Sequence, residues 1–275
     1  MSKNHLYLQN EIRRHDPDRY LLSLFVPARY RPALHAVFMF NHEIAKTREV
    51  VSETQLGLIR LQWWRERIAE IYDGLDQDKA APEHEVLQGL EAAIREYGLS
   101  QEYFDALVFA REFDLEDVCP SHVDGVIHYA DYTGAPLLRL VMQIMGDDPD
   151  QDMIYAIAVN YGLIGLIRAV PFFGNQRRCY LPEDLMQDHG VRPSKLYEGK
   201  DIEGVSKIVE TLSSHIVQEL KPSNKFLRGT QTLAMIYLKQ LQSSGYDPFS
   251  SRMAVPPAFK EIRILRKQFF LGFPC

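Results

Sequence analysis

The sequence predicts an all-α fold, and three observations lead to that prediction. Apolar residues recur every three to four residues over most of the chain, which is the period of a helix with one buried face. No comparable stretch alternates β-branched and polar residues as a strand would. Short polar segments with proline or glycine separate the periodic stretches. Because no repeat or low-complexity tract interrupts this pattern, we expect a single domain over residues 1–275, with antiparallel helices around a central cavity.

Proline and glycine mark several of the expected helix ends. Pro32 is suited to the first turn of a helix, and Gly98 is suited to closing one. The sequence KPSN at 221–224 divides the last pair of helices. The helices expected on these grounds cover residues 32–45, 56–72, 86–97, 103–115, 123–145, 152–170, 206–220 and 229–242.

The composition is that of a globular protein without a dominant charge. The residues are 46% apolar and 25% charged with a net charge of −6, which does not favour a nucleic-acid partner. Cys119, Cys179 and Cys275 show no CxxC spacing, so we expect neither a zinc site nor a disulfide framework. The first residues show no apolar leader, and no apolar run approaches the roughly 20 residues that span a bilayer. We therefore expect a cytoplasmic protein, or at most one that binds a membrane peripherally.

Three stretches of the chain carry a family resemblance. They are ALHAVFMFNHEIAKTREVV followed by RLQWWRERIAEIYDG, then HEVLQGLEAAIREYGLSQEYFDALVFAREFDLED, and GLIGLIRAVPFFGNQRRCYLPEDLMQDHGV. Together they resemble the squalene/phytoene synthase family, which contains head-to-head prenyl transferases. The resemblance covers about residues 20–271 and implies an isoprenoid-synthase-like helical bundle.

The resemblance also implies two acidic motifs, which in the enzymes hold magnesium ions against the diphosphate of the substrate. Both motifs have lost acids here. In the first, Ala45 and Lys46 replace aspartates and only Glu49 keeps a carboxylate. We interpret the second as an apolar face of core residues, and because one carboxylate cannot organise several divalent ions, we expect no catalytic residue, no metal and no cofactor. The positions of the second motif are Gly165, Ala169, Phe172 and Phe173, and the face interpreted as core consists of Gly165, Ala169 and Phe173, which are four residues apart.

Five basic residues would gather at one end of the cavity if the fold of the family holds. Arginine pairs bind phosphate groups without a metal, so one expected role is to hold an anionic lipid or a prenyl phosphate. The other is ion pairing with nearby acids, among them Glu43, Glu49, Glu183 and Asp184. The five residues are Lys46, Arg48, Arg168, Arg177 and Arg178.

Three further groups of residues have alternative interpretations. The acidic sequence EFDLED at 112–117 could hold a cation, but a helix end with ordinary ion pairs is simpler. His35 and His42 lie two helical turns apart, and no third zinc ligand is evident. The C-terminal residues 256–275 mix basic and apolar side chains, so they could contact an anionic membrane surface or close the bundle as a last helix.

Within the family, the stretches FNHEIAKTREVVSETQLGLIRLQWWRERIAEIY and GLIRAVPFFGNQRRCYLPEDLMQDHGV are similar to a non-catalytic branch that also lacks the aspartates. Mitochondrial members of this branch assist the assembly of respiratory complex I, the NADH:ubiquinone oxidoreductase, at the inner membrane. This implies a pseudoenzyme that binds complex I subunits or other assembly factors, on the matrix side of the inner membrane if the protein is mitochondrial. Two alternatives stay open. One is a divergent prenyl or terpenoid transferase that acts on isoprenoid diphosphates and uses magnesium, and the other is a non-catalytic isoprenoid or lipid carrier.

Overall fold

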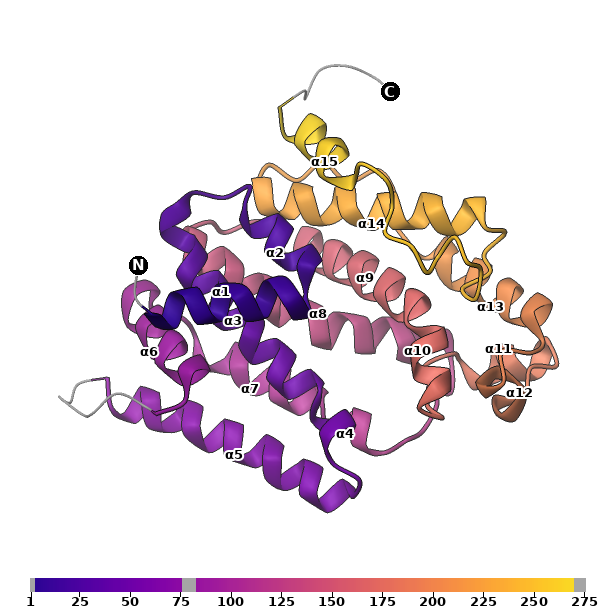
Figure 1. The fold of residues 1–275 in the computed structure, drawn as a ribbon, viewed down its shortest axis with the longest axis horizontal. Coiled ribbons are helices and arrows are strands. Elements are labelled where there is room, and N and C mark those ends of the chain that lie inside the picture. Colours follow the sequence, from indigo (N-terminus) through magenta and orange to yellow (C-terminus); the bar gives the residue numbers. More distant parts are fainter. Residues whose placement is uncertain (1–2, 76–82, 270–275) are drawn as a thin grey trace. The chain divides into compact units, whose positions relative to one another are not determined.

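The computed structural model describes residues 3–75 and 83–269, and within them the chain forms helices and no strand (Figure 1). The all-α prediction is therefore confirmed. In these same residues no helix combines the length and the apolar character needed to cross a membrane.

The chain divides into two compact units. The first is formed by residues 1–116 and 135–150, and the second by residues 117–134 and 151–275. Helix α8 (Val123–Met145) therefore belongs to both, with its first half in the second unit. The single domain expected for the whole chain stays a prediction.

Helix α3 (Arg31–Ala45) forms much of the core of the first unit. Its side chains are largely apolar, and it is buried on most sides against α1 (Lys3–His15) and α6 (Glu85–Tyr97). The ring of Phe40 meets Trp64 edge to face, with 5.6 Å between the ring centroids. The remaining elements of this unit are α2 (Pro17–Ser23), the 3-10 turns Ala28–Tyr30 and Phe113–Leu115, α4 (Thr47–Val50), α5 (Thr54–Asp73), α7 (Gln101–Ala110) and the second half of α8.

Helix α9 (Gln151–Arg168) joins several helices of the second unit. It packs against α14 (Lys225–Ser243) and α13 (Ile202–Ser214). The first half of α8 passes so close to α9 that a Cβ on Gly162 would lie 2.7 Å from the Cβ of Ala130, which explains the glycine. The unit also contains α10 (Val170–Asn175), α11 (Glu183–Asp188), α12 (Pro193–Tyr197) and α15 (Lys260–Phe269).

Two predicted helices are wrong at their ends, and the first of them, expected over 103–115, stops at Ala110. The expected helix over 206–220 stops at Ser214. Beyond it, the N–H of Val217 donates to Asn160 Oδ1 at 2.9 Å, and Asn160 Nδ2 donates to the carbonyl of Val217 at 2.7 Å. A buried amide on α9 thus takes the place of helical hydrogen bonds, because tertiary partners satisfy the same backbone groups.

Candidate functional site

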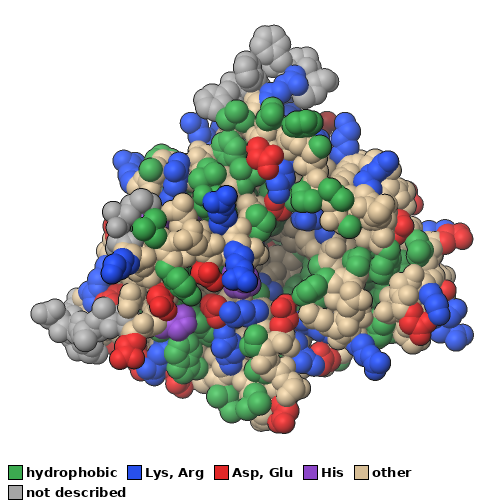
Figure 2. All heavy atoms as spheres, in the orientation of Figure 1, with side chains coloured by type: hydrophobic (Ala, Val, Ile, Leu, Met, Phe, Trp, Pro, Cys, Tyr) green, Lys and Arg blue, Asp and Glu red, His purple; other side chains and the backbone are tan. Residues whose placement is uncertain are grey.

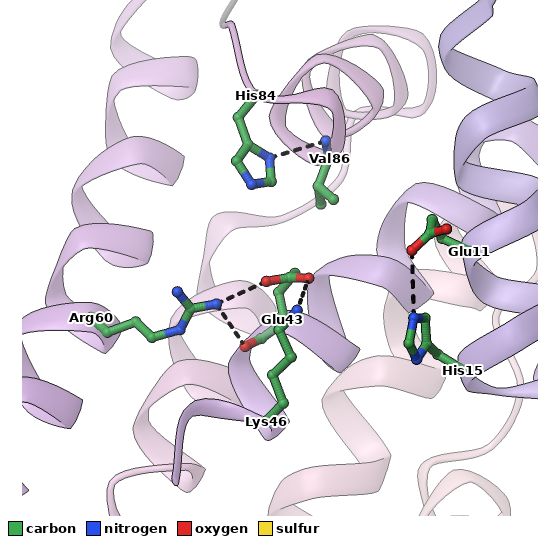
Figure 3. A network of polar contacts seen from close by, with 7 residues as sticks. All are labelled: Glu11, His15, Glu43, Lys46, Arg60, His84 and Val86. Atoms are coloured by element: carbon green, nitrogen blue, oxygen red, sulfur yellow. Dashed lines mark hydrogen bonds and ion pairs between the residues drawn. The ribbon is translucent and has the colours of Figure 1, made fainter. Parts of the chain in front are cut away.

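The first predicted motif lies where α3 ends, in the first unit. Lys46 follows the last residue of α3, and its Nζ lies 2.5 Å from Oε1 of Glu43 on the preceding turn. Arg60 reaches the same carboxylate from α5, with Nη2 2.8 Å from Oε2 (Figure 3). Each oxygen of Glu43 therefore contacts one cation.

This ion-pair cluster fills the place where the resemblance implies a metal-binding aspartate. The side chain of Glu43 is only 14% exposed, and the two cations compensate for the water that its carboxylate has lost. The expected pairing of Lys46 with Glu43 is confirmed. Glu49 is exposed on α4, and Arg48 donates to the carbonyl of Val51 at 3.1 Å.

The residues at the motif positions do not fit a magnesium site. Magnesium requires oxygen ligands, whereas position 46 carries an ammonium group and Gly165, Ala169 and Phe173 carry no side-chain oxygen. Across residues 3–75 and 83–269, no three His, Cys, Asp or Glu side chains are grouped so that they could hold a metal ion. That the protein works without a metal or cofactor stays a prediction.

The second predicted motif spans the junction of α9 and α10 in the second unit. The N–H of Ala169 donates to the carbonyl of Gly165 at 3.0 Å, and the N–H of Phe173 donates to the carbonyl of Ala169 at 2.8 Å. Helical hydrogen bonding thus continues through the junction and keeps the three residues on one face.

The interpretation of this face as core is wrong. Gly165, Ala169 and Phe173 are each partly exposed, and Phe172 is 49% exposed. A Cβ on Gly165 would meet no atom within 4 Å. Gly165, Ala169 and Phe173 thus form an apolar face without a carboxylate, and this face is open at Gly165.

Two predicted arginines at this junction contact aromatic rings. The Cζ of Arg168 lies 3.4 Å from the ring centroid of Tyr237 on α14. The guanidinium of Arg178 donates to the hydroxyl of Tyr180 and lies 5.3 Å from the ring centroid of Phe173. These contacts fix the orientation of the two guanidinium groups through cation–π attraction.

Arg177 is the remaining arginine of the predicted basic cluster, and Asp184 is one of the expected acidic partners of that cluster. Arg177 is exposed, with a left-handed φ of 56°. The expected use of Asp184 as a partner for the basic cluster is wrong, because its carboxylate contacts Nδ1 of His122 at 3.0 Å. Since Lys46 and Arg48 belong to the first unit and the three arginines to the second, the gathering of all five stays a prediction.

A small apolar cavity lies beside the second motif, inside the second unit. It measures about 10 Å³, enough for one water-sized molecule, so it is far too small for an isoprenoid chain. Its lining residues are Val126, Leu163, Leu166, Ile167, Val170, Tyr180, Leu181 and Leu212.

Each of the two histidines considered for zinc stacks on a different histidine of α1. The ring of His35 stacks on His5 at 5.6 Å and contacts Ser23, whereas His42 stacks on His15 at 4.5 Å. Burial lowers the pKa of His35 to about 4 and also lowers that of His42. Both histidine pairs contribute to the contact between α1 and α3, because each pair consists of one histidine from α1 and one from α3.

The acidic sequence at 112–117 forms the simpler of the two expected arrangements. Asp114 is buried and lies 3.5 Å from Nη1 of Arg111, three residues earlier. Glu112 lies 2.9 Å from Nη2 of Arg65 on α5. The expected ion pairs at this helix end are confirmed.

Both the sequence and the fold of the chain are similar to those of known proteins. A sequence model of squalene/phytoene synthase matches residues 12–260. The chain belongs to the squalene/phytoene synthase family. Two solved structures of similar fold are a squalene synthase from Alicyclobacillus acidocaldarius and a dehydrosqualene synthase in complex with a ligand. Their TM-scores are 0.74 and 0.73, at 18% and 16% identity, and the alignments cover 90% and 97% of this chain and 95% of each of theirs. These likenesses confirm the isoprenoid-synthase-like fold.

Relatives within the squalene/phytoene synthase family carry two kinds of name. The "NADH dehydrogenase (ubiquinone) complex I, assembly factor 6" of Bos taurus is 29% identical over 88% of this chain and 75% of its own length. The human protein of that name is 28% identical over the same shares. A presqualene diphosphate synthase of Rhodopseudomonas palustris is 24% identical over 62% of this chain and 60% of that enzyme. The resemblance inferred from the motifs is therefore confirmed.

Sequence reasoning missed the partners that hold several of these side chains. Arg60 lies on a separate helix from Glu43, and Tyr237 lies far along the chain from Arg168. No local spacing in the sequence could have found them. Each of α1 and α3 carries two widely spaced histidines, but nothing in the local sequence pairs those of one helix with those of the other.

Proposed function

We propose that this protein acts in the assembly of respiratory complex I by binding and without catalysing prenyl transfer. The observation that carries the proposal is the ion-pair cluster of Glu43, Lys46 and Arg60, which occupies the position of the first magnesium motif. An enzyme that ionises a diphosphate needs free carboxylates there, whereas this cluster binds its best-placed carboxylate to two cations. The relatives named as complex I assembly factors supply the process.

The proposed partners are complex I subunits or other assembly factors. The proposed place of action is the cytoplasm beside the inner membrane, or the matrix side of that membrane in a mitochondrion. We expect such a protein to act through the surfaces that it presents to its client, because the fold of a family does not by itself carry the chemistry of that family.

Deletion of the gene tests the process. We expect a lower amount of assembled complex I on native gels and lower NADH:ubiquinone oxidoreductase activity, both restored by the wild-type gene. A Lys46→Asp variant is the informative second rescue, because it returns an acid to the motif. Equal rescue by this variant would support a role without catalysis, whereas normal complex I in the deletion strain would overturn the proposal.

Incubation with magnesium and farnesyl or geranylgeranyl diphosphate tests the absence of prenyl transfer. We expect no release of diphosphate under conditions in which a squalene synthase turns over. Steady release by the wild-type protein would instead favour the divergent transferase, and the Glu43→Gln variant would then show whether this carboxylate takes part.

A carrier function is the second candidate, and the open face at Gly165 favours it. This face begins beside Arg168, and Arg178 lies over Phe173 at its other end, so apolar surface and fixed cations adjoin. Calorimetric titration with farnesyl diphosphate in the absence of magnesium tests it. Binding that weakens in a Gly165→Leu variant, with Lys239→Gln on α14 as the control, would support the carrier, and no measurable heat would exclude it at this face.

A further inference from the structure

Helix α15 is fixed to the second unit by one side only. Ile264 is fully buried against the unit, and Gln268 is 7% exposed. The amide of Gln268 donates to the carbonyl of Lys225 at 2.7 Å and accepts from Arg228 at 3.3 Å, both at the start of α14. These contacts set which side of α15 faces outward.

The outward side is not the polar surface expected of a helix that only closes a bundle. Ile262 and Leu265 are 60% and 46% exposed, and at 100° per residue both point away from Ile264. In the segment that leads into the helix, Val255 and Phe259 are 61% and 72% exposed. The helix thus carries a second apolar strip with no cover from the described residues.

Basic side chains border this strip. Arg263, Arg266 and Lys267 are exposed, and Glu261 is the single acid of α15. Hydrophobic and basic side chains lie side by side at the top of Figure 2, where α15 lies in Figure 1. Because the whole chain has a net charge of −6, this excess of positive charge is local to the helix.

The preceding segment is held in place as well. Gln240 of α14 donates to the carbonyls of Arg252 and Val255 at 2.7 and 2.8 Å. Phe259 has a left-handed φ of 56°, which turns the chain immediately before α15 begins. The exposed apolar residues are therefore presented by a fixed backbone.

We propose that residues 255–269 bind the surface of an anionic membrane. Phe259, Ile262 and Leu265 enter the boundary between headgroups and acyl chains, and the basic side chains contact lipid phosphates. A helix with an apolar strip bordered by Lys and Arg has this mode of binding, and charge complementarity selects anionic over neutral lipids. This inference does not depend on a role in complex I assembly.

Vesicle co-sedimentation of the full-length protein tests the proposal. One set of vesicles contains phosphatidylcholine alone, and the other also contains cardiolipin. We expect the protein to partition onto the anionic vesicles more than about tenfold better than onto the neutral ones, and high salt to remove most of the difference. Equal partitioning onto both would overturn the proposal.

Two variants and two matched controls assign the binding to α15. We expect more than about a tenfold loss of binding for Arg263→Gln/Arg266→Gln/Lys267→Gln and for Ile262→Ser/Leu265→Ser. The controls change exposed residues elsewhere, and they should bind as the wild type does: Arg192→Gln/Lys207→Gln/Lys239→Gln for charge and Ile59→Ser for apolar area. Unchanged binding in both α15 variants would overturn the proposal.

A fluorescence measurement separates insertion from loss of folding. In a Leu265→Trp variant that keeps the wild-type melting temperature, the added emission should shift to the blue with anionic vesicles and stay unchanged with neutral ones. No shift with either would overturn the proposal. Absence of vesicle binding, together with loss of complex I assembly in the charge variant, would assign α15 to a protein partner instead.

Discussion

Two glycines of α9, three residues apart, provide the sharpest test of the packing around the second motif. A Cβ on Gly162 would lie 2.7 Å from the Cβ and 3.1 Å from the Cα of Ala130 on α8. A Cβ on Gly165 would meet nothing within 4 Å. The same substitution to alanine therefore meets backbone at one site and open space at the other.

The magnitudes follow from two opposing terms. Alanine is better than glycine in a helix interior by up to about 1 kcal/mol, and this gain is common to both sites. At Gly162, overpacking against Ala130 costs about 1–3 kcal/mol, because atoms of a helix backbone cannot move aside freely. We expect Gly165→Ala to be more stable than the wild type by about 0.5–1 kcal/mol, and Gly162→Ala to be less stable by up to about 2 kcal/mol.

Urea unfolding followed by far-UV circular dichroism measures both variants. Because the propensity gain cancels, the difference between their free energies of unfolding reports the overlap with Ala130 alone. Free energies that agree within about 0.5 kcal/mol would refute the close approach of α8 and α9 at Gly162. A destabilised Gly165→Ala would refute the open face.

Three further predictions concern charged and titratable groups. Burial lowers the pKa of His35 from 6.5 to about 4, so the unfolded chain binds the proton more tightly, and His35 should cost about 3 kcal/mol of stability as the pH falls from 6.5 to 4. Urea titrations at several pH values should therefore show a shallower loss of stability for His35→Gln than for the wild type, and an equal slope would contradict this. Glu43→Gln leaves two cations without their carboxylate and should lower the free energy of unfolding at pH 7 by about 1–3 kcal/mol; no loss would show that the cluster adds nothing to stability. The hydrogen bond between the two thiols lowers the pKa of Cys119 and, together with burial, raises that of Cys179, so iodoacetamide should alkylate Cys119 before Cys179, as mass spectrometry would show. Alkylation of Cys179 before Cys119 would contradict this arrangement.

Much of the fold could be read from the sequence, because several long helices carry their own apolar period, although α1 was not among the expected helices. The glycine that closes α6 was found for the same local reason, since Gly98 takes the left-handed φ of 63° that ends a helix. The end of α13 could not be found locally. Its chain leaves the helix at Ser214 because Asn160, far away in sequence, binds the backbone of Val217.

For the candidate site, the residue types could be predicted from the sequence, whereas their packing could not. Loss of the acids at Lys46 and Ala169 is visible in the sequence, and so is the basic character of the surrounding residues. That Gly165 faces open space while Gly162 touches Ala130 is not visible there, because both are glycines on one helix and differ only in what packs against them.

The sequence by itself determined the family, the helical architecture and the absence of a complete acidic motif, since these depend on residue types at fixed local spacing. Only the tertiary structure decided that Lys46 and Arg60 share the carboxylate of Glu43, and that α15 buries Ile264 while exposing Leu265. Such outcomes depend on which surfaces of distant helices meet. Whether an ion pair forms or an apolar strip stays uncovered depends on these contacts between helices, because desolvation and charge neutralisation act between groups that are close in space.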